Sequence, residues 1–183
     1  MKYKKTQIEG LLIIEPDIFA DDRGHFSETF STQKYKDIGI DETFTQDNMS
    51  LSHKNVLRGL HYQKPPYAQG KLVSVLSGSV LDVAVDMRQE SPTKGQYVAV
   101  ELSSKNHKQF WIPSGFAHGF LSLEDDTIFT YKCTNYYNKE SESGIRWDDP
   151  VITIDWPTKT PIVSHKDQEL PLWNEVMKES SKY

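Results

Sequence analysis

The sequence is poor in cysteine: Cys133 is the one thiol among 183 residues. A single thiol cannot form a disulfide within the chain, and it is too few for a structural zinc site built on cysteines. Chains without disulfides are typical of reducing compartments. We therefore expect a cytoplasmic protein.

Long apolar runs are missing as well. The N-terminal segment "MKYKKTQIEGLLIIEPD" begins with lysines, but its apolar run covers only residues 11–14. This run is too short for the hydrophobic part of a signal peptide or for a membrane span. We expect no association with a membrane.

Runs of basic residues are also absent, and the formal net charge is −5. The lack of basic runs and of an Arg-rich face argues against nucleic acid as the main partner. An anionic small molecule would instead need a local group of cations. The fold would have to assemble that group from residues scattered in the sequence: Arg23, Arg58, Lys71 and Lys166.

The chain has no internal repeat, no low-complexity segment and no linker rich in proline, glycine or serine. Its length suits one domain, and a domain of this size buries about two-thirds of the surface of its unfolded chain. We expect a single domain over residues 1–183, with a core large enough to hold a rigid pocket.

Short β-strands are what the sequence has in abundance. In "KLVSVLSGSVLDVAVDMR", residues 71–88, apolar residues alternate with polar or small ones from 81 to 87, and "SGS" at 77–79 supplies a turn. This pattern predicts a β-hairpin. Further strands are expected at residues 10–16, 43–49, 57–63, 96–102, 109–112, 118–123 and 127–134. Eight or more short strands are typical of an all-β sandwich or barrel.

Helix is sparse in this pattern. "STQKYKDIG" predicts about two turns with Ser31 as the N-cap, and "LPLWNEVMKE" near the C-terminus predicts one more short helix. Neither segment is long enough to organise a fold.

One motif links these strands to a known class of site. "IPSGFAH" has the spacing P-x-G-x-x-H, which ends at His118 and resembles the second motif of the cupin superfamily of jelly-roll barrels. In cupins the first motif adds H-x-H and a carboxylate, and these side chains bind a metal. Here the positions of H-x-H are occupied by His61, Tyr62 and Gln63, and Lys71 follows eight residues after Gln63. A carboxamide is a weak ligand and an ammonium repels a divalent ion, so we expect no metal.

A barrel without a metal must work by acid–base chemistry. His61 is the natural base because its unperturbed pKa lies near physiological pH. Strand alternation would place Arg58 and His61 on opposite faces. Gly59 between them predicts a β-bulge, which would bring both side chains to one face.

Two more residues have both a structural and a functional interpretation. Tyr131 in "TIFTYKC" is either an ordinary core tyrosine or a reactive one. "VSHKDQELP" is the composition of a solvated loop, but its Asp167 can also hydrogen-bond a histidine ring and fix its tautomer.

Taken together, these residues resemble the dTDP-4-dehydrorhamnose 3,5-epimerases, a family of metal-free, cupin-like enzymes. The resemblance covers residues 21–167, and "LRGLHYQ" with "PSGFAHGF" is its most specific part. The other matching stretches are "DDRGHFSETF", "FTQDNMSLSHKNV", "QGKLVSVLSGSVLDVAVDMR", "SPTKGQYVAVELS", "YKCTNYY" and "SHKD".

The resemblance implies a jelly roll that dimerises by sharing strands and uses no cofactor. It implies that His61, paired with Asp167, removes the protons next to the C4 ketone of a dTDP-linked 4-keto-6-deoxysugar, at C3 and C5. Lys71 would hold the enolate oxygen, and Tyr131 would deliver a proton from the opposite face. The substrate-binding set that it implies is Arg23, Glu28, Gln46, Asp47, Asn48, Arg58, Lys71, His118, Glu142 and Lys166.

The chemistry agrees with this assignment. A C–H bond next to a ketone is acidic because the charge of the carbanion moves onto oxygen, so an epimerase needs a base, an oxyanion donor and an acid on the other face. Ser74, His25 and Lys94 depart from the family pattern. None of them belongs to the implied catalytic set.

Three other interpretations remain open at this point. An epimerase could invert only C3 or only C5 of another nucleotide-linked sugar, because the same base serves either carbon. A non-catalytic cupin could bind a nucleotide sugar, but it would not need a base, an oxyanion donor and an acid together. Gln63 and Lys71 argue against a metal-dependent oxygenase.

Overall fold

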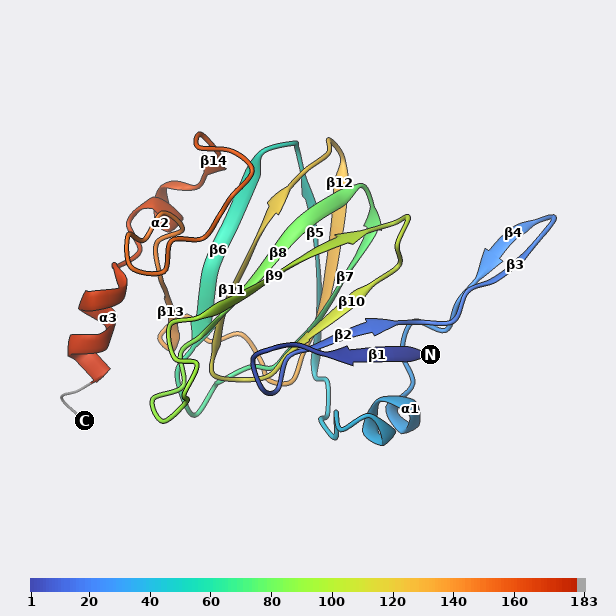
Figure 1. The fold of residues 1–183 in the computed structure, drawn as a ribbon, viewed down its shortest axis with the longest axis horizontal. Helices are drawn as coiled ribbons and strands as arrows, with labels where there is room; N and C mark the ends of the chain where they lie inside the picture. Colours follow the sequence, from blue (N-terminus) through green and yellow to red (C-terminus); the bar gives the residue numbers. More distant parts are fainter. Residues whose placement is uncertain (181–183) are drawn as a thin grey trace.

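The structure is a computed structural model, and it describes residues 1–180. Two β-sheets pack face to face and form a jelly-roll-like sandwich (Figure 1). The first sheet has the order β1 (Lys2–Lys5), β2 (Leu12–Glu15), β10 (Gln109–Ile112), β7 (Lys71–Ser77), β12 (Thr127–Cys133) and β5 (Gln46–Ser52). The second has the order β13 (Glu142–Gly144), β6 (Val56–Gln63), β11 (Phe116–Ser122), β8 (Ser79–Asp86) and β9 (Tyr97–Ser103).

Smaller elements surround the sandwich. β14 (Ile162–Val163) runs parallel to β6, and β3 (Phe19–Asp21) with β4 (Gly24–Phe26) forms a separate hairpin. Figure 1 shows this hairpin projecting away from the body. The helices are α1 (Thr32–Asp37), α2 (His165–Gln168) and α3 (Trp173–Ser180).

The core lies mainly between the two sheets. Valines of β7 and β8 pack there with the aromatic side chains of β10, β11 and β12, namely Phe110, Phe116, Phe120 and Phe129. A second apolar cluster covers the outer side of the second sheet, where residues of the segment 145–177 pack, including Trp156 and Trp173 of α3. The sandwich therefore has an apolar outer layer over its second sheet and an interior that can hold a pocket.

Most of the expected elements are present. Strands occur at all seven of the separately predicted segments, although β5 begins at Gln46 rather than at residue 43. Ser31 takes the N-cap position of α1 but makes no side-chain cap hydrogen bond, and α3 covers the predicted C-terminal helix. The last three residues of the predicted domain, 181–183, lie outside the described part of the chain.

The predicted hairpin over residues 71–88 is wrong. β7 and β8 are strands, but β7 pairs with β10 and β12 in the first sheet, whereas β8 pairs with β9 and β11 in the second. The turn around Gly78 therefore carries the chain from one sheet to the other. Asp82 and Asp86, which occupy the polar positions of the alternation, are both fully buried.

Among residues 1–180, none of the helices has the length and hydropathy needed to cross a lipid bilayer.

The buried carboxylate of Asp86 ties the end of β8 to the following loop. It accepts hydrogen bonds from Arg88 Nε at 2.9 Å and Nη2 at 2.8 Å, and from the hydroxyls of Ser91 and Thr93 at 2.6 and 2.7 Å. Burial by itself would raise the pKa of Asp86, but the hydrogen bonds outweigh it and lower the pKa from 3.8 to about 2. The ionised form is therefore part of the folded structure.

We expect Asp86→Asn to lower the free energy of unfolding at pH 7 by about 2 kcal/mol, because a hydrogen-bonded buried charge is removed from Arg88. The pKa is lower in the folded than in the unfolded chain, so this stabilisation is present above pH ~4 and is lost as the pH falls toward 2. Urea unfolding of both proteins from pH 7 to pH 3 measures the difference. A gap that does not narrow in acid would contradict the assignment.

Candidate active site

The bulge at Gly59 determines how β6 presents its polar side chains. Between β6 and β11, His118 is the partner of His61 and Phe120 is the partner of Arg58, so β6 has one residue more than β11 in this interval. The predicted bulge is therefore confirmed. Gly59 has φ +115°, a backbone conformation that residues with a side chain rarely adopt.

The bulge also needs close backbone contact. A Cβ on Gly59 would lie 2.6 Å from the Cα of Gly119 on β11, and a Cβ on Gly119 would lie 2.6 Å from the carbonyl oxygen of Arg58. Both neighbours are backbone atoms, which cannot move aside as a side chain would. The result is that Arg58 and His61 line the same hollow.

His61 is paired with a buried carboxylate. Its Nε2 lies 2.6 Å from Asp167 Oδ1, and Asp167 Oδ2 accepts from the backbone N–H of Gly59 at 3.1 Å. Ser164 caps α2 by accepting the N–H of Asp167 at 3.1 Å, which fixes where the carboxylate stands. Burial acts to raise the pKa of Asp167, but the bonds from His61 and Gly59 outweigh it and lower the pKa below 3.8.

With Asp167 ionised, the proton between the pair belongs on Nε2 of His61, and Nδ1 is left as the basic nitrogen. The sequence places the two residues 106 positions apart, and only the fold brings them together.

Two adjoining hollows meet at the same three side chains. One has a volume of about 280 Å³ and the other of about 450 Å³, and His61, Lys71 and Tyr131 line both. His61 comes from β6 of the second sheet, whereas Lys71 on β7 and Tyr131 on β12 come from the first. A molecule in this space would therefore have His61 on one side and Tyr131 on the other.

Burial affects the protonation of both residues from the first sheet. It lowers the pKa of Lys71 below 10.5, while the charges of Asp82 and Glu142 act in the opposite direction. Burial raises the pKa of Tyr131 above 10, so its hydroxyl stays protonated at neutral pH. Lys71 Nζ also lies 3.5 Å from the carbonyl oxygen of His61.

A second histidine–carboxylate pair lies deeper in the sandwich. His118 Nε2 is 2.8 Å from Asp82 Oδ2 and 3.0 Å from Oδ1. Asp82 is 0% exposed and His118 is 7% exposed. His118 also lines the larger hollow, next to Lys71.

Charged side chains stand at the rim. Glu142 Oε2 accepts from Lys166 Nζ at 2.6 Å and from the hydroxyl of Tyr137 at 2.8 Å. Glu142 and Tyr137 line the smaller hollow and Lys166 lines the larger one. Arg58 lines the larger hollow too, and its guanidinium is held by Ser52 Oγ at 3.1 Å.

Two amides of β5 complete the smaller hollow. Gln46 Nε2 donates to Asn48 Oδ1 at 3.0 Å, and Asn48 Nδ2 lies 3.5 Å from the sulfur of Cys133. Both side chains line this hollow. The structure thus gathers ten of the predicted residues around one space: His61, Lys71, Tyr131, Asp167, Gln46, Asn48, Arg58, His118, Glu142 and Lys166.

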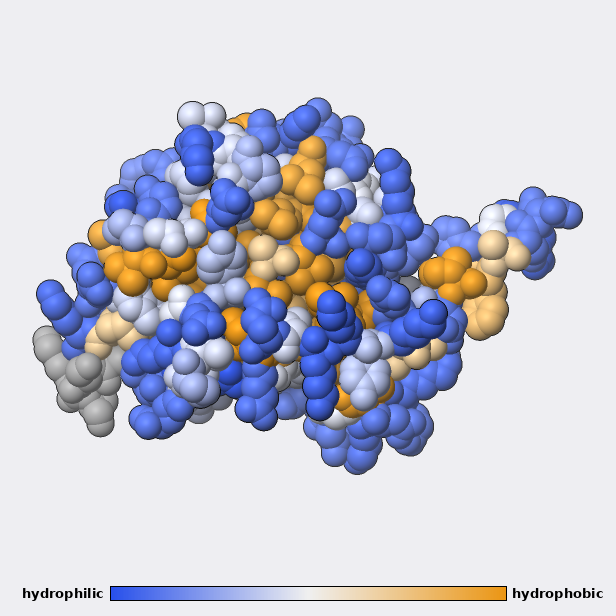
Figure 2. All heavy atoms as spheres, viewed as in Figure 1, coloured by the Kyte–Doolittle hydropathy of each residue, from blue (hydrophilic) through white to orange (hydrophobic). Residues whose placement is uncertain are grey.

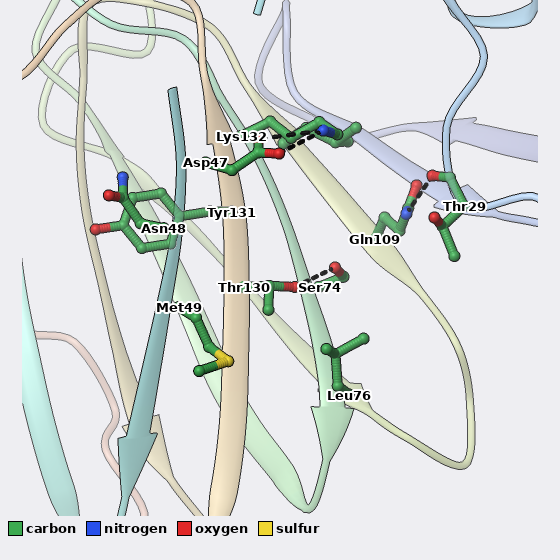
Figure 3. A pocket seen from close by; sticks show the side chains of 11 residues that line it. Thr29, Asp47, Asn48, Met49, Ser74, Leu76, Gln109, Thr130, Tyr131 and Lys132 are labelled. Carbon is green, nitrogen blue, oxygen red and sulfur yellow. Dashed lines mark hydrogen bonds and ion pairs between the residues drawn. The ribbon is translucent and has the colours of Figure 1, made fainter. Parts of the chain in front are cut away.

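Asp47 is not part of that space. Strand alternation turns it to the outer side of the first sheet, where it binds Lys132 Nζ at 3.0 and 3.1 Å. Figure 3 shows this pair on the opposite side of β5 from Asn48. The predicted substrate contact of Asp47 is therefore not supported within this chain.

Arg23 and Glu28 are also separate from the cavity. Arg23 lies between β3 and β4 of the projecting hairpin, binds Asp21 and has an 89% exposed side chain. Glu28 binds Lys34 at 2.8 Å on the same side of the molecule. Within one chain, neither residue lines the hollows that His61 lines.

The position that would carry a metal ligand in cupins has a structural role here. Gln63 Nε2 donates to the carbonyl oxygens of Tyr67 and Tyr136, and its Oε1 accepts the N–H of Asn138 at 2.7 Å. Within residues 1–180, no group of three or more His, Cys, Asp or Glu side chains is placed to hold a metal ion. Metal independence of the reaction stays a prediction.

Two further residues at the site, Asp82 and Tyr137, were not predicted from the sequence. In the sequence, Asp82 is a polar residue in an alternating strand, and such a residue normally faces water. In the structure both faces of β8 are buried, so Asp82 is buried too. Tyr137 in "NYYN" carried no signal beyond its polar tip.

Comparison with known proteins agrees with the site. A family model described as dTDP-4-dehydrorhamnose 3,5-epimerase matches residues 5–175. The chain is 52% identical over 168 residues to the dTDP-4-dehydrorhamnose 3,5-epimerase of Shigella flexneri, which covers 91% of this chain and 93% of that protein. It is 51% identical over 180 residues to that of Escherichia coli (strain K12), with 97% of each chain covered.

Solved structures show the same likeness. The crystal structure of dTDP-6-deoxy-D-glucose-3,5-epimerase from Legionella pneumophila Philadelphia 1, in complex with dTDP-4-keto-L-rhamnose, superposes with a TM-score of 0.93. The two sequences are 52% identical, and the match covers 97% of this chain and 95% of that one.

The glycine contact beneath the site can be tested by substitution. We expect Gly119→Ala to destabilise the fold by about 1–3 kcal/mol, because its methyl group would meet the backbone of Arg58. We also expect the NMR signals of the His61 ring to shift, since the bulge moves. Gly39→Ala is the control: a Cβ there meets nothing within 4 Å, so it strains only its own positive φ and should leave the His61 signals unchanged. Parental stability and unmoved His61 signals in Gly119→Ala would disprove the role of the contact.

Proposed function

This chain belongs to the dTDP-4-dehydrorhamnose 3,5-epimerase family, and from that premise we propose that His61, Lys71 and Tyr131 carry out its reaction. The protein is an isomerase of dTDP-L-rhamnose biosynthesis. It epimerises dTDP-4-dehydro-6-deoxy-D-glucose at C3 and C5 to dTDP-4-dehydro-L-rhamnose. The observation that carries the residue assignment is that three side chains from two sheets line one shared space.

His61 is the base in this proposal. Its Nε2 is occupied by Asp167, so Nδ1 takes the proton from C3 or C5 next to the ketone. Asp167 then stabilises the imidazolium, because the two form a partly buried ion pair with a short hydrogen bond. The carboxylate itself stays ionised, in agreement with its lowered pKa.

Lys71 stabilises the charge that develops on the C4 oxygen. Its ammonium lies in a buried region where a charge-assisted hydrogen bond is stronger than in water. No proton leaves Lys71 in this step: the proton from carbon goes to His61, and the electron pair moves onto oxygen.

Tyr131 returns a proton on the other side. It reaches the cavity from β12 of the first sheet, opposite β6, so protonation there inverts the carbon instead of restoring it. The raised pKa of its hydroxyl keeps the acid protonated until it is used.

The rim residues fit the anionic part of the substrate. Arg58 and Lys166 are cations on the wall of the larger hollow, and a diphosphate there would offer acceptors for both. Gln46 and Asn48 offer amide donors and acceptors near His61, where the sugar hydroxyls would lie. The mechanism as proposed needs neither a metal nor a cofactor.

Proton exchange separates the base from the acid. In D₂O with the dTDP-linked 4-keto substrate, His61→Ala should lose both inversion and deuterium uptake at C3 and C5, by about 10²–10⁴-fold or more. Tyr131→Phe should still take up deuterium, because the enolate forms on Lys71 and His61 returns a proton to the original face. We expect uptake without matching inversion, most visibly at C5. NMR of H3 and H5 measures both rates.

Three outcomes would contradict this assignment or the function itself. If Tyr131→Phe loses exchange as completely as His61→Ala, or inverts at the parental rate, the two-sided mechanism is wrong. If the parent exchanges only H3 or only H5, the chain is a single-site epimerase. If the parent exchanges neither, it is a binding protein.

A homodimer is the second part of the proposal. The resemblance implies one that shares strands, and the apolar run at residues 10–14 is one segment that could pair with a neighbour's sheet edge. In this fold that run is not free to do so, because β2 is paired on both sides within its own chain, with β1 and with β10. The projecting hairpin supports a dimer better: Phe19 is 61% exposed and Phe26 is 68% exposed.

Figure 2 shows hydrophobic atoms on this hairpin, beyond the body of the molecule. The two rings pair with each other at a centroid distance of 6.5 Å, but an isolated two-stranded ribbon is marginally stable, and both rings remain exposed. The outer side of the first sheet offers a matching apolar surface, with Met49, Leu51 and Leu76 more than half exposed. We infer that the hairpin of one chain packs against its partner and brings Arg23 and Glu28 to the partner's substrate site.

Phe19→Asp combined with Phe26→Asp should halve the mass measured by light scattering, because the hairpin loses its apolar surface. Val151→Asp changes another apolar residue that is more than half exposed, in the segment over the second sheet, and should leave the mass unchanged. Mixing Arg23→Ala chains with His61→Ala chains should restore activity to about a quarter of the parental value, since half the dimers are mixed and each has one intact site. No restoration, or a parent that is monomeric and fully active, would argue against the shared site.

A further inference from the structure

Asp82 is a buried carboxylate that the proposed mechanism does not yet use. It lies in the middle of β8, is 0% exposed, and is surrounded by the apolar core between the sheets, beside Phe120 on β11. Burying an ionisable pair in such a core is costly, and well-packed apolar residues often serve the fold as well or better. Its presence therefore indicates a function at the adjoining cavity.

Within residues 1–180, His118 is the one side chain to which the carboxylate of Asp82 is hydrogen-bonded. Both carboxylate oxygens lie within 3.0 Å of Nε2, and the ring of Phe129 stacks on the imidazole with a centroid distance of 6.1 Å and an angle of 20°. The orientation of the ring is therefore set by its nitrogen and by one of its faces. Nδ1 makes no hydrogen bond to any residue of the part that the structure describes, although His118 lines the larger hollow.

His118 stands between the other reactive groups. It is the register partner of His61 across the bulged pair of β11 and β6, and it shares the wall of the hollow with Lys71. Burial lowers the pKa of His118, and the charges of Lys71 and His61 act in the same direction. The charge of Lys71 also acts to lower the pKa of Asp82, against the larger effect of burial. The C4 oxygen, which the proposed function places at Lys71, would thus lie near Nδ1 of His118.

We propose that Asp82 is a positioning residue for enolate formation: it holds His118 so that an N–H at Nδ1, together with the ammonium of Lys71, faces the C4 oxygen. This inference rests on the proposed function and adds a second donor to it. The imidazole gives up no proton in the step. The proton from carbon still goes to His61, and His118 only donates a hydrogen bond to the oxyanion.

Nδ1 of His118 can donate a hydrogen bond only if the His118–Asp82 pair carries the right number of protons. A hydrogen is present on Nδ1 if the pair is imidazolium with carboxylate, or if Asp82 carries a proton that it donates to Nε2. Both forms are neutral overall. The remaining form, a carboxylate beside a neutral imidazole protonated at Nε2, would turn a lone pair toward the oxyanion. Burial opposes that net negative charge: it raises the pKa of Asp82, and an enolate nearby would oppose it further.

Asp82→Asn tests the idea with the least change in shape. Asparagine cannot balance an imidazolium. If its amide oxygen accepts from Nε2, Nδ1 is left without a hydrogen, and if its NH2 group donates to Nε2, the donor at Nδ1 is a neutral imidazole, which forms a weaker hydrogen bond than an imidazolium. We expect the rates of deuterium uptake at C3 and C5 to fall by about 10- to 100-fold, somewhat less than the 10²–10³-fold typical for loss of a whole oxyanion donor. The affinity for dTDP should stay within about twofold, because dTDP has no C4 ketone to contact His118.

Asp86→Asn is the matched control, since it alters a second buried carboxylate four residues along the same strand. It should lose stability while its folded fraction exchanges at the parental rate. A cycle with His118→Gln shows whether Asp82 acts through His118. In that background, Asp82→Asn should have no further effect on exchange.

A measurement on the parent chain keeps the idea testable if Asp82→Asn does not fold. ¹⁵N NMR should show a hydrogen on Nδ1 of His118 at neutral pH, and an unprotonated Nδ1 would overturn the proposal. Parental exchange in Asp82→Asn, an equal loss of dTDP affinity, or additive effects in the cycle would each overturn it as well. If the parent exchanges deuterium and Asp82→Asn exchanges it at the same rate, this inference is wrong but the proposed function stands. If the parent exchanges no deuterium, both the proposed function and this inference are wrong.

Discussion

The backbone contact between β6 and β11 at Gly59 and Gly119 is the constraint on which the site depends. It allows the extra residue in β6, and the extra residue puts Arg58 and His61 on one wall. The same turn of the backbone presents the N–H of Gly59 to Asp167, so one contact positions both members of the His61–Asp167 pair. A Cβ at Gly59 or Gly119 would force the two strands apart, and Arg58 and His61 would then no longer share one wall.

A sandwich interior is an unusual place for charged groups, and here it concentrates them. Lys71, Asp82 and His118 lie deep between the sheets, where the low polarity strengthens each of their interactions. Each charge has a counterpart nearby, which is what makes such burial tolerable. A ketone held in that environment would meet donors that are already oriented, so little reorganisation accompanies the formation of an enolate.

The positions that depart from the family pattern lie away from this interior. Ser74 bonds the hydroxyl of Thr130 on the outer side of the first sheet (Figure 3). His25 lies on β4 of the projecting hairpin against His107, and Lys94 binds Gln89 in a loop. Their variation can alter surfaces and contacts between chains without changing the chemistry of the cavity.

The sequence by itself determined the strand content and the bulge at Gly59, because these follow from residue type and from local spacing. Residue type also suggested His61 as the base, whereas the roles of Lys71 and Tyr131 came from the resemblance to the family and stay proposals. Tertiary structure alone decided how the strands are distributed. The turn at Gly78 joins two sheets instead of two neighbours, since apolar residues on both faces of β8 can be buried only in the middle of a sheet with a covered outer side. It also decided that Asp82 faces His118 and that Asp47 faces outward. Contacts between residues 36 or 106 positions apart leave no trace in local pattern, so only the packed sheets could place Asp82 beside His118 and Asp167 beside His61.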